Sequence, residues 1–162
     1  MSLPALLHYT TEEEYKKHYI EHYCDKSPIT SYDGIPVMFY TDRFEHAFYK
    51  RTSKSWKARK DRFCQPRGER MDWITYVLQD PTIKPKKGYD KDKDSYDETR
   101  RVAFLSEENY LVVIYINKNG QGKFITAYLV DDEETADKIR SSPDWEKFWW
   151  LEHKKTTGYL AQ

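Results

Sequence analysis

Residues 101–130 read RVAFLSEENYLVVIYINKNGQGKFITAYLV, and this stretch decides the fold of the chain. It holds three apolar segments, 101–106, 110–117 and 123–130, which are rich in β-branched and aromatic residues and are separated by polar breaks. The Asn119-Gly120 pair before the third segment favours a tight hairpin turn. The stretch therefore predicts an antiparallel meander. Regular alternation in the third strand would place Phe124, Thr126 and Tyr128 on one face, and Ile125, Ala127 and Leu129 on the other.

Helical patterns lie on both sides of this meander. Three glutamates after Thr10 and Thr11 predict a capped helix over 11–23. Similar signals predict helices starting at Thr41 or Asp42, running from Pro66 to about Gln79, and running from Asp131 or Asp132 to Arg140. A short strand over 36–40 and a long polar loop over 80–98 complete the pattern. Helices followed by an antiparallel meander predict an α+β fold.

Length and composition limit the class of protein. The 162 residues and 19.6 kDa suit one domain over 1–162, large enough to form a core without disulfides. The longest apolar run, 110–116, is far shorter than a membrane span, and no secretory signal is visible. Cys24 and Cys64 are expected to be free thiols. We therefore expect a cytoplasmic protein with no membrane partner.

The charges are balanced overall but unevenly distributed. The chain has 27 basic and 27 acidic residues, which excludes a uniformly basic coat protein and an acidic disordered tail. Residues 43–70 carry ten Lys or Arg against three Asp or Glu, whereas 1–42 and 131–153 are acidic. Such a basic block can attract a polyanion to one face, or its charges can pair within the fold.

Metal and cofactor motifs are not found. The acidic ladder over 90–94 fails the calcium-loop pattern, because its sixth position is Ser95 and its twelfth is Arg101. His18 and His22 have helical spacing but no HExxH pattern. There is no glycine-rich phosphate loop and no GxSxG turn. We therefore expect no metal and no cofactor.

A cationic set of residues remains. It comprises His46, Arg67, Arg70, Arg100 or Arg101, and Thr126. Cleavage of RNA without a metal needs a base for the 2′-hydroxyl, an acid for the leaving 5′-oxygen and fixed positive charge. Histidine, arginine and a threonine hydroxyl can supply these functions.

Each member of the set also has a structural interpretation. His46 could be a core histidine packed beside Phe44 and Phe48. Arg67 and Arg70, which fall one turn apart on a helix and can face the same direction, could instead pair with acidic neighbours such as Glu69 or Asp72.

The ordered series FEHAF, RGERMDWI, YDETRRVAF, YLVVIYI, FITAY and KIRSSPDW resembles a bacterial and phage family. That family is the phage-associated branch of the barnase/EndoU/colicin/RelE-like ribonuclease superfamily, and the resemblance covers about residues 37–145. It implies an α+β fold with N-terminal helices on a twisted antiparallel sheet of about four strands, followed by a C-terminal helix. It also implies metal-independent cleavage of tRNA or mRNA, in toxins or phage conflict systems that can have a cognate antitoxin or immunity protein. The N-terminal helix 11–23 and the aromatic tail 145–162 lie outside it.

The resemblance assigns roles to individual residues. The family's helical histidine falls on His46, the arginines of its RxER motif on Arg67 and Arg70, and its TAY hydroxyl on Thr126; these four are the expected catalytic residues. Gly68 stands where alanine is expected. The expected substrate-binding residues are Arg100, Arg101, Tyr128 and Lys60.

These observations predict an endoribonuclease that leaves a 2′,3′-cyclic phosphate. One alternative is a non-catalytic module that binds RNA or an acidic protein through the same basic surface. Another is an interaction protein whose aromatic segment 145–150 docks on a partner or on a second copy.

Overall fold

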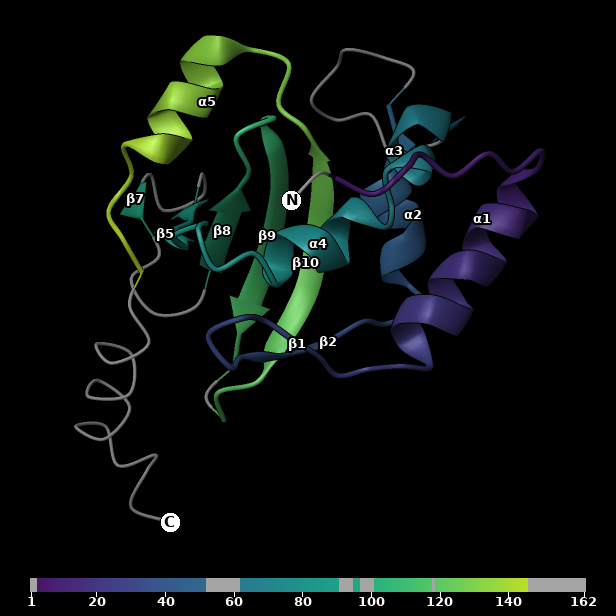
Figure 1. The fold of residues 1–162 in the computed structure, drawn as a ribbon, viewed down its shortest axis with the longest axis horizontal. Helices are drawn as coiled ribbons and strands as arrows, with labels where there is room; N and C mark the ends of the chain where they lie inside the picture. The colour runs from purple at the N-terminus through teal and green to yellow at the C-terminus, as the bar shows by residue number, and fades with distance from the viewer. Residues whose placement is uncertain (1–2, 52–61, 91–94, 97–100, 118, 146–162) are drawn as a thin grey trace.

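The computed structural model describes residues 3–51, 62–90, 95–96, 101–117 and 119–145. The fold is α+β, as predicted, and is built on a mixed six-stranded sheet (Figure 1). The sheet order is β1 (Ile29–Thr30), β2 (Pro36–Met38), β10 (Gly122–Leu129), β9 (Tyr110–Ile116), β8 (Arg101–Leu105) and β5 (Lys86–Lys87). Two small hairpins pair β3 (Tyr49–Lys50) with β4 (Arg62–Phe63), and β6 (Tyr89–Asp90) with β7 (Ser95–Tyr96).

The meander β8-β9-β10 is confirmed, but the expectation of an antiparallel sheet of about four strands is corrected. β2 pairs in parallel with β10, and the two-residue strands β1 and β5 extend the sheet at its edges. The parallel pair arises because α2, α3 and α4 lie between β2 and the meander in the chain, so β2 is not joined to it by a hairpin. Strands of two residues are too short to show any periodicity in the sequence.

The helices follow the predicted pattern with one break. They are α1 (Glu12–Tyr19), which continues as a π-helical turn η1 (Ile20–Cys24), α2 (Arg43–Phe48), α3 (Gln65–Glu69), α4 (Trp73–Leu78) and α5 (Glu133–Arg140). The single helix expected over 66–79 is divided into α3 and α4. The turn between them is held by Tyr23, whose hydroxyl donates to the Met71 carbonyl at 2.8 Å.

Gly68 has a packing role in α3. A Cβ atom at this position would lie 2.8 Å from the Phe63 ring and 3.1 Å from the Tyr15 ring. An alanine, as expected from the resemblance, would therefore collide with two aromatic side chains unless they moved.

Two hydrophobic clusters lie on opposite faces of the sheet. The larger is aromatic and packs α1, η1, α2 and α4 against β9 and β10; it includes Tyr15, Tyr19, Tyr23, Phe39, Phe44, Phe48 and Phe124. The smaller lies under α5 and joins Ala136 to Ala103, Leu111 and Val113. In Figure 1, α5 and the helices α1–α3 accordingly lie on opposite sides of the strands. Among the described residues, no helix is long and apolar enough to cross a membrane.

The alternation predicted for the third strand is wrong. The register of β10 shifts between Phe124, which pairs with Ile114, and Thr126, which pairs with Val113. This β-bulge places one extra residue, Ile125, in β10. Phe124 therefore lies in the aromatic cluster, whereas Thr126 pairs with a residue of the α5 cluster.

Candidate functional site

Helix α2 lies against the free edge of β10. β2 pairs with β10 only at Gly122 and Lys123, so the rest of β10 pairs, within the described residues, with β9 alone. Arg43, at the start of α2, donates to the Ile125 carbonyl through Nε at 3.3 Å and Nη2 at 2.9 Å. This bond fixes the start of α2 at the bulge of β10. It also gives a partner to the Ile125 carbonyl, which would otherwise need a water molecule.

His46 lies on the exposed side of α2. Phe44, Ala47 and Phe48 are buried, with at most 1% of their surface exposed, whereas His46 is exposed. Its position is about 60° around the helix from Arg43, which reaches the edge of β10. The core-histidine interpretation is therefore wrong, and His46 lies on the solvent side of α2, next to the position of Arg43.

Arg67 connects α3, the end of α2 and β10. Its Nη1 donates to the Tyr49 carbonyl at 3.2 Å and to the Ala47 carbonyl at 3.4 Å. Its guanidinium carbon lies 5.0 Å from the centre of the Tyr128 ring, a cation–π distance. Arg67 therefore bonds to the residue next to His46 and stacks on one of the expected substrate-binding residues.

Arg70 points elsewhere. It donates through Nη1 to the Pro66 carbonyl at 2.9 Å and lies 5.2 Å from the centre of the Trp73 ring. Burial raises the pKa of Tyr110, while the charges of Arg70 and Arg67 act to lower it. Both guanidinium groups therefore act on the same buried hydroxyl. Neither arginine forms an ion pair with Glu69, Asp72 or any other described residue.

Three buried polar atoms, two in expected site residues and one in Tyr110, have no hydrogen-bond partner among the described residues. They are Arg70 Nε, Tyr110 Oη and Thr126 Oγ1. Buried polar atoms are almost always hydrogen-bonded in folded proteins, so such a group needs an explanation. A bound ligand or ordered water that supplies acceptors and donors would provide one.

Of the remaining expected residues, the structure describes the backbone of Arg101 alone, and it lies apart from Tyr128. Arg101 lies in β8, two strands away from β10, and pairs with Tyr115 of β9. Tyr128 of β10 lies level with Leu111 of β9 and Leu105 of β8, which is four positions along β8 from Arg101. From strand spacing and rise, its Cα lies about 16 Å from that of Tyr128. Arg100 and Lys60, and much of the basic block 43–70, lie outside the described residues.

Two participating residues were missed in the sequence. Tyr110 was hidden because it opens an apolar strand, where a tyrosine is expected to pack rather than to present a hydroxyl. Arg43 follows the helix cap and was counted only among the basic residues. An arginine one turn before His46 is the signal that could have identified it.

His18 belongs to a separate polar network. It is 8% exposed, its Nδ1 lies 2.8 Å from the Tyr9 hydroxyl, and its Nε2 lies 2.8 Å from Asp72 Oδ1. The His22 ring packs against it at a tilt, with ring centres 4.2 Å apart. Both nitrogens of His18 are therefore engaged in tying α1 to the turn before α4. The described residues contain no group of three or more His, Cys, Asp or Glu that could hold a metal ion.

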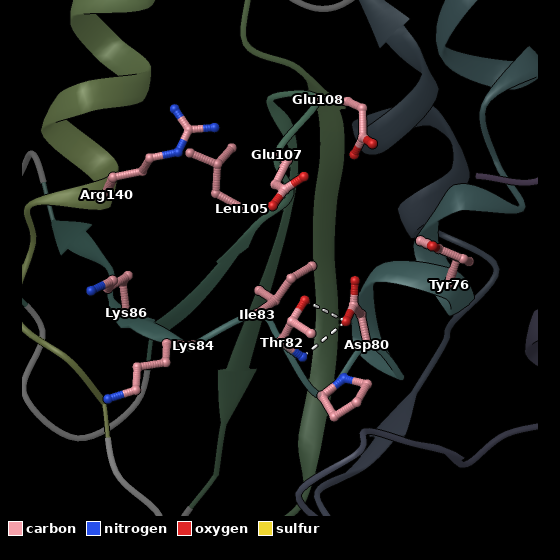
Figure 2. Close-up of a pocket in the computed structure, with 11 residues that line it drawn as sticks. Tyr76, Asp80, Thr82, Ile83, Lys84, Lys86, Leu105, Glu107, Glu108 and Arg140 are labelled. Atoms are coloured by element: carbon pink, nitrogen blue, oxygen red, sulfur yellow. Dashed lines mark hydrogen bonds between the residues drawn. The ribbon is translucent and has the colours of Figure 1, made fainter. Parts of the chain in front are cut away.

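A hollow among the described residues lies elsewhere. It has a volume of about 520 Å³ and lies beside the loop between α4 and β5. Figure 2 shows its basic side chains (Lys84, Lys86 and Arg140) on one side and its acidic ones (Asp80, Glu107 and Glu108) on the other. Lys84 and Lys86 pair with Asp144, and Arg140 donates to the Ser106 carbonyl at 3.0 Å. None of the expected site residues lines it.

Comparison with known proteins gives no match: no protein-family profile, no curated protein and no solved structure is similar to this chain.

Proposed function

We propose that this protein is a metal-independent endoribonuclease that cleaves RNA by attack of the 2′-hydroxyl on the adjacent phosphorus. The observation that carries the proposal is the arrangement at the free edge of β10. There the helix bearing His46 is fixed by Arg43, Arg67 bonds beside His46, and Thr126 follows the bulge with its hydroxyl buried and unpartnered. These are the types of side chain that cleavage without a metal requires.

The proposed roles follow from the chemistry of each group. His46 accepts the proton of the 2′-hydroxyl or donates one to the leaving 5′-oxygen, because an imidazole can act as either base or acid. Arg67 provides fixed positive charge, because two backbone carbonyls and a tyrosine ring hold its guanidinium in place. Thr126 donates its hydroxyl to a phosphate oxygen. Arg70 adds a second positive charge beside the Tyr110 hydroxyl.

The proposed step balances without a co-reactant. The bond from the 2′-oxygen to phosphorus forms as the bond from phosphorus to the 5′-oxygen breaks. One proton leaves the 2′-hydroxyl and one reaches the 5′-oxygen. The products are a 2′,3′-cyclic phosphate and a 5′-hydroxyl end.

The test is incubation of the purified protein with total tRNA and with mRNA in EDTA, followed by end-group analysis of the fragments. We expect cyclic phosphate ends from the wild-type protein and their loss in His46→Ala. The matched control is His8→Ala, which removes an exposed histidine that lies outside this site. Fragments with 3′-hydroxyl ends, or equal cleavage by the His46→Ala protein, would contradict the proposal.

A non-catalytic module that binds RNA is the second candidate. The observation that favours it is that Arg67 already donates to two backbone carbonyls, which is a structural use of its guanidinium. In that case the protein would retain RNA in a filter or gel-shift assay while leaving it intact.

A further inference from the structure

We propose that Tyr40 and Lys123 form a stacking subsite for an unpaired base of single-stranded RNA, beyond the end of β2. This inference rests on the proposed function, because it places a second contact for the same strand of RNA. Neither residue belongs to the cationic set that the sequence identified.

The strand pattern places Lys123 on the sheet face that carries Thr126, and its contact with Tyr40 brings the ring to the same side. Val37 is buried in the aromatic cluster, so Met38 points to the opposite face, and the Tyr40 ring, just beyond β2, lies 5.4 Å from Lys123 Nζ on that side. Lys123 pairs with Met38 on one side and with Tyr115 on the other, one position before the buried Phe124. Because of the bulge, Thr126 and Tyr128 lie on this face as well.

Tyr40 has the features of a stacking platform. It is 44% exposed, among the most exposed large aromatic residues of the described chain. Lys123 Nζ lies 5.4 Å from the centre of its ring, a cation–π contact that holds the ring beside a positive charge. A base that stacks on such a ring also brings its phosphate close to the lysine.

The backbone of Tyr40 is fixed in place. Its carbonyl accepts a hydrogen bond from the Tyr19 hydroxyl at 2.8 Å and one from the Arg43 amide at 3.1 Å. A platform that is already ordered loses little conformational entropy when a base stacks on it. The Arg43 contact also joins the platform directly to the helix that carries His46.

The charges between the platform and the candidate site favour a polyanion. Lys123, Arg43 and Arg67 succeed one another along the free edge of β10. Two carboxylates of the same segment, Asp42 and Glu45, offset part of this charge; they also act to raise the pKa of Tyr19 and of Tyr49, respectively.

The spacing fits an extended strand of RNA. Lys123 and Tyr128 pair with Tyr115 and Leu111, which are four positions apart in β9, or about 13 Å at the usual rise per residue. A single strand that follows β10 can therefore reach the platform at one end and the Arg67–Tyr128 pair at the other. A duplex cannot use the platform, because its bases are already stacked and paired.

The experiment measures binding of a 2′-O-methyl oligonucleotide of about ten nucleotides, which blocks attack by the 2′-oxygen, by fluorescence anisotropy. The variants are Tyr40→Leu, which removes the ring, and Tyr40→Phe, which keeps it. Tyr32→Leu is the matched control, because Tyr32 is 42% exposed and lies in the turn between β1 and β2. Thermal melting of each variant checks that it is folded.

We expect Tyr40→Leu to weaken single-strand binding about tenfold, the usual size of one base–aromatic contact, and Tyr40→Phe and Tyr32→Leu to bind like the wild type. Binding of the same oligonucleotide annealed to its complement should not respond to Tyr40→Leu. Equal affinity of folded Tyr40→Leu and wild type would overturn the stacking subsite and leave the proposed function standing. Absence of RNA binding and cleavage by the wild-type protein would overturn both.

Discussion

Replacement of Arg67 by alanine tests whether this side chain serves only the stability of the fold or also RNA cleavage. The side chain makes a hydrogen bond to the Tyr49 carbonyl at 3.2 Å, a longer one to the Ala47 carbonyl at 3.4 Å, and a cation–π contact with Tyr128 at 5.0 Å. The partly exposed hydrogen bonds contribute about 1 kcal/mol together, below the range for buried charged donors. The cation–π contact adds about 0.5–1 kcal/mol.

The folded protein should therefore lose about 2 kcal/mol of unfolding free energy at most, which corresponds to a fall in Tm of about 6 °C for a chain of this length. If Arg67 also stabilises the charge that develops on the phosphate, cleavage per folded molecule should fall by about 10²–10³-fold. The structural contacts alone predict no such fall. Arg67→Lys, which keeps the charge but loses the planar fork, should recover part of the rate.

The assay measures melting and the rate of cyclic phosphate formation on one preparation of each variant. Arg140→Ala is the matched control, because Arg140 also donates to a backbone carbonyl, that of Ser106, at 3.0 Å, but is the last residue of α5. We expect the control to keep the wild-type rate per folded molecule. An Arg67→Ala protein that melts lower yet cleaves at the wild-type rate would refute the proposed role of this arginine and leave it a purely structural residue.

Four further results are expected. His46→Ala should keep the fold and lower cleavage by about 10²–10⁴-fold, measured as turnover beside a melting curve; a folded variant with wild-type turnover would remove His46 from the mechanism. EDTA should leave cleavage unchanged, and a loss restored by Mg²⁺ or Mn²⁺ would contradict the metal-independent step. RNA affinity should fall with about the 2.8 power of salt if residues 43–70 contact four phosphates, and a salt-independent affinity in a titration series would exclude that block. Burial acts to raise the pKa of Asp72, but its hydrogen bond with His18 and the nearby histidine charge outweigh it and lower the pKa from 3.8. Because the lowered value belongs to the folded state, Asp72 stabilises the fold above about pH 4 and loses this effect as the pH falls further, so Asp72→Asn should lower Tm at neutral pH more than near pH 3.

The sequence predicted the parts of the fold that have a long local signal. The meander over 101–130 has three apolar segments separated by polar breaks. The helices after Thr11 and Asp132 each begin with a capping residue followed by acidic residues. The parallel pairing of β2 with β10 could not be predicted, because it depends on how three helices pack between the two strands. The division of the helix after Pro66 depends on Tyr23, whose hydroxyl reaches the Met71 carbonyl from a distant helix.

The candidate site could be predicted only as a set of residue types. His46, Arg67 and Thr126 were chosen for their chemistry, and their positions in the fold depend on contacts that no local pattern reports. The bond from Arg43 to the Ile125 carbonyl joins residues 82 positions apart. The unpartnered hydroxyl of Tyr110 depends on how deeply that side chain is buried, which a strand pattern does not distinguish from simple packing.

The bulge in β10 explains how one strand serves both the core and the site. In a regular strand, Phe124, Thr126 and Tyr128 would share a face, and since Phe124 is fully buried, the two hydroxyl-bearing residues would enter the aromatic core. The extra residue at Ile125 reverses the faces beyond it, so Thr126 and Tyr128 lie on the face of Lys123 instead. The same bulge presents the Ile125 carbonyl to Arg43, which fixes the helix that carries His46. One inserted residue therefore positions the strand residues and the helix residue of the candidate site together, which is a frequent role of bulges beside active sites.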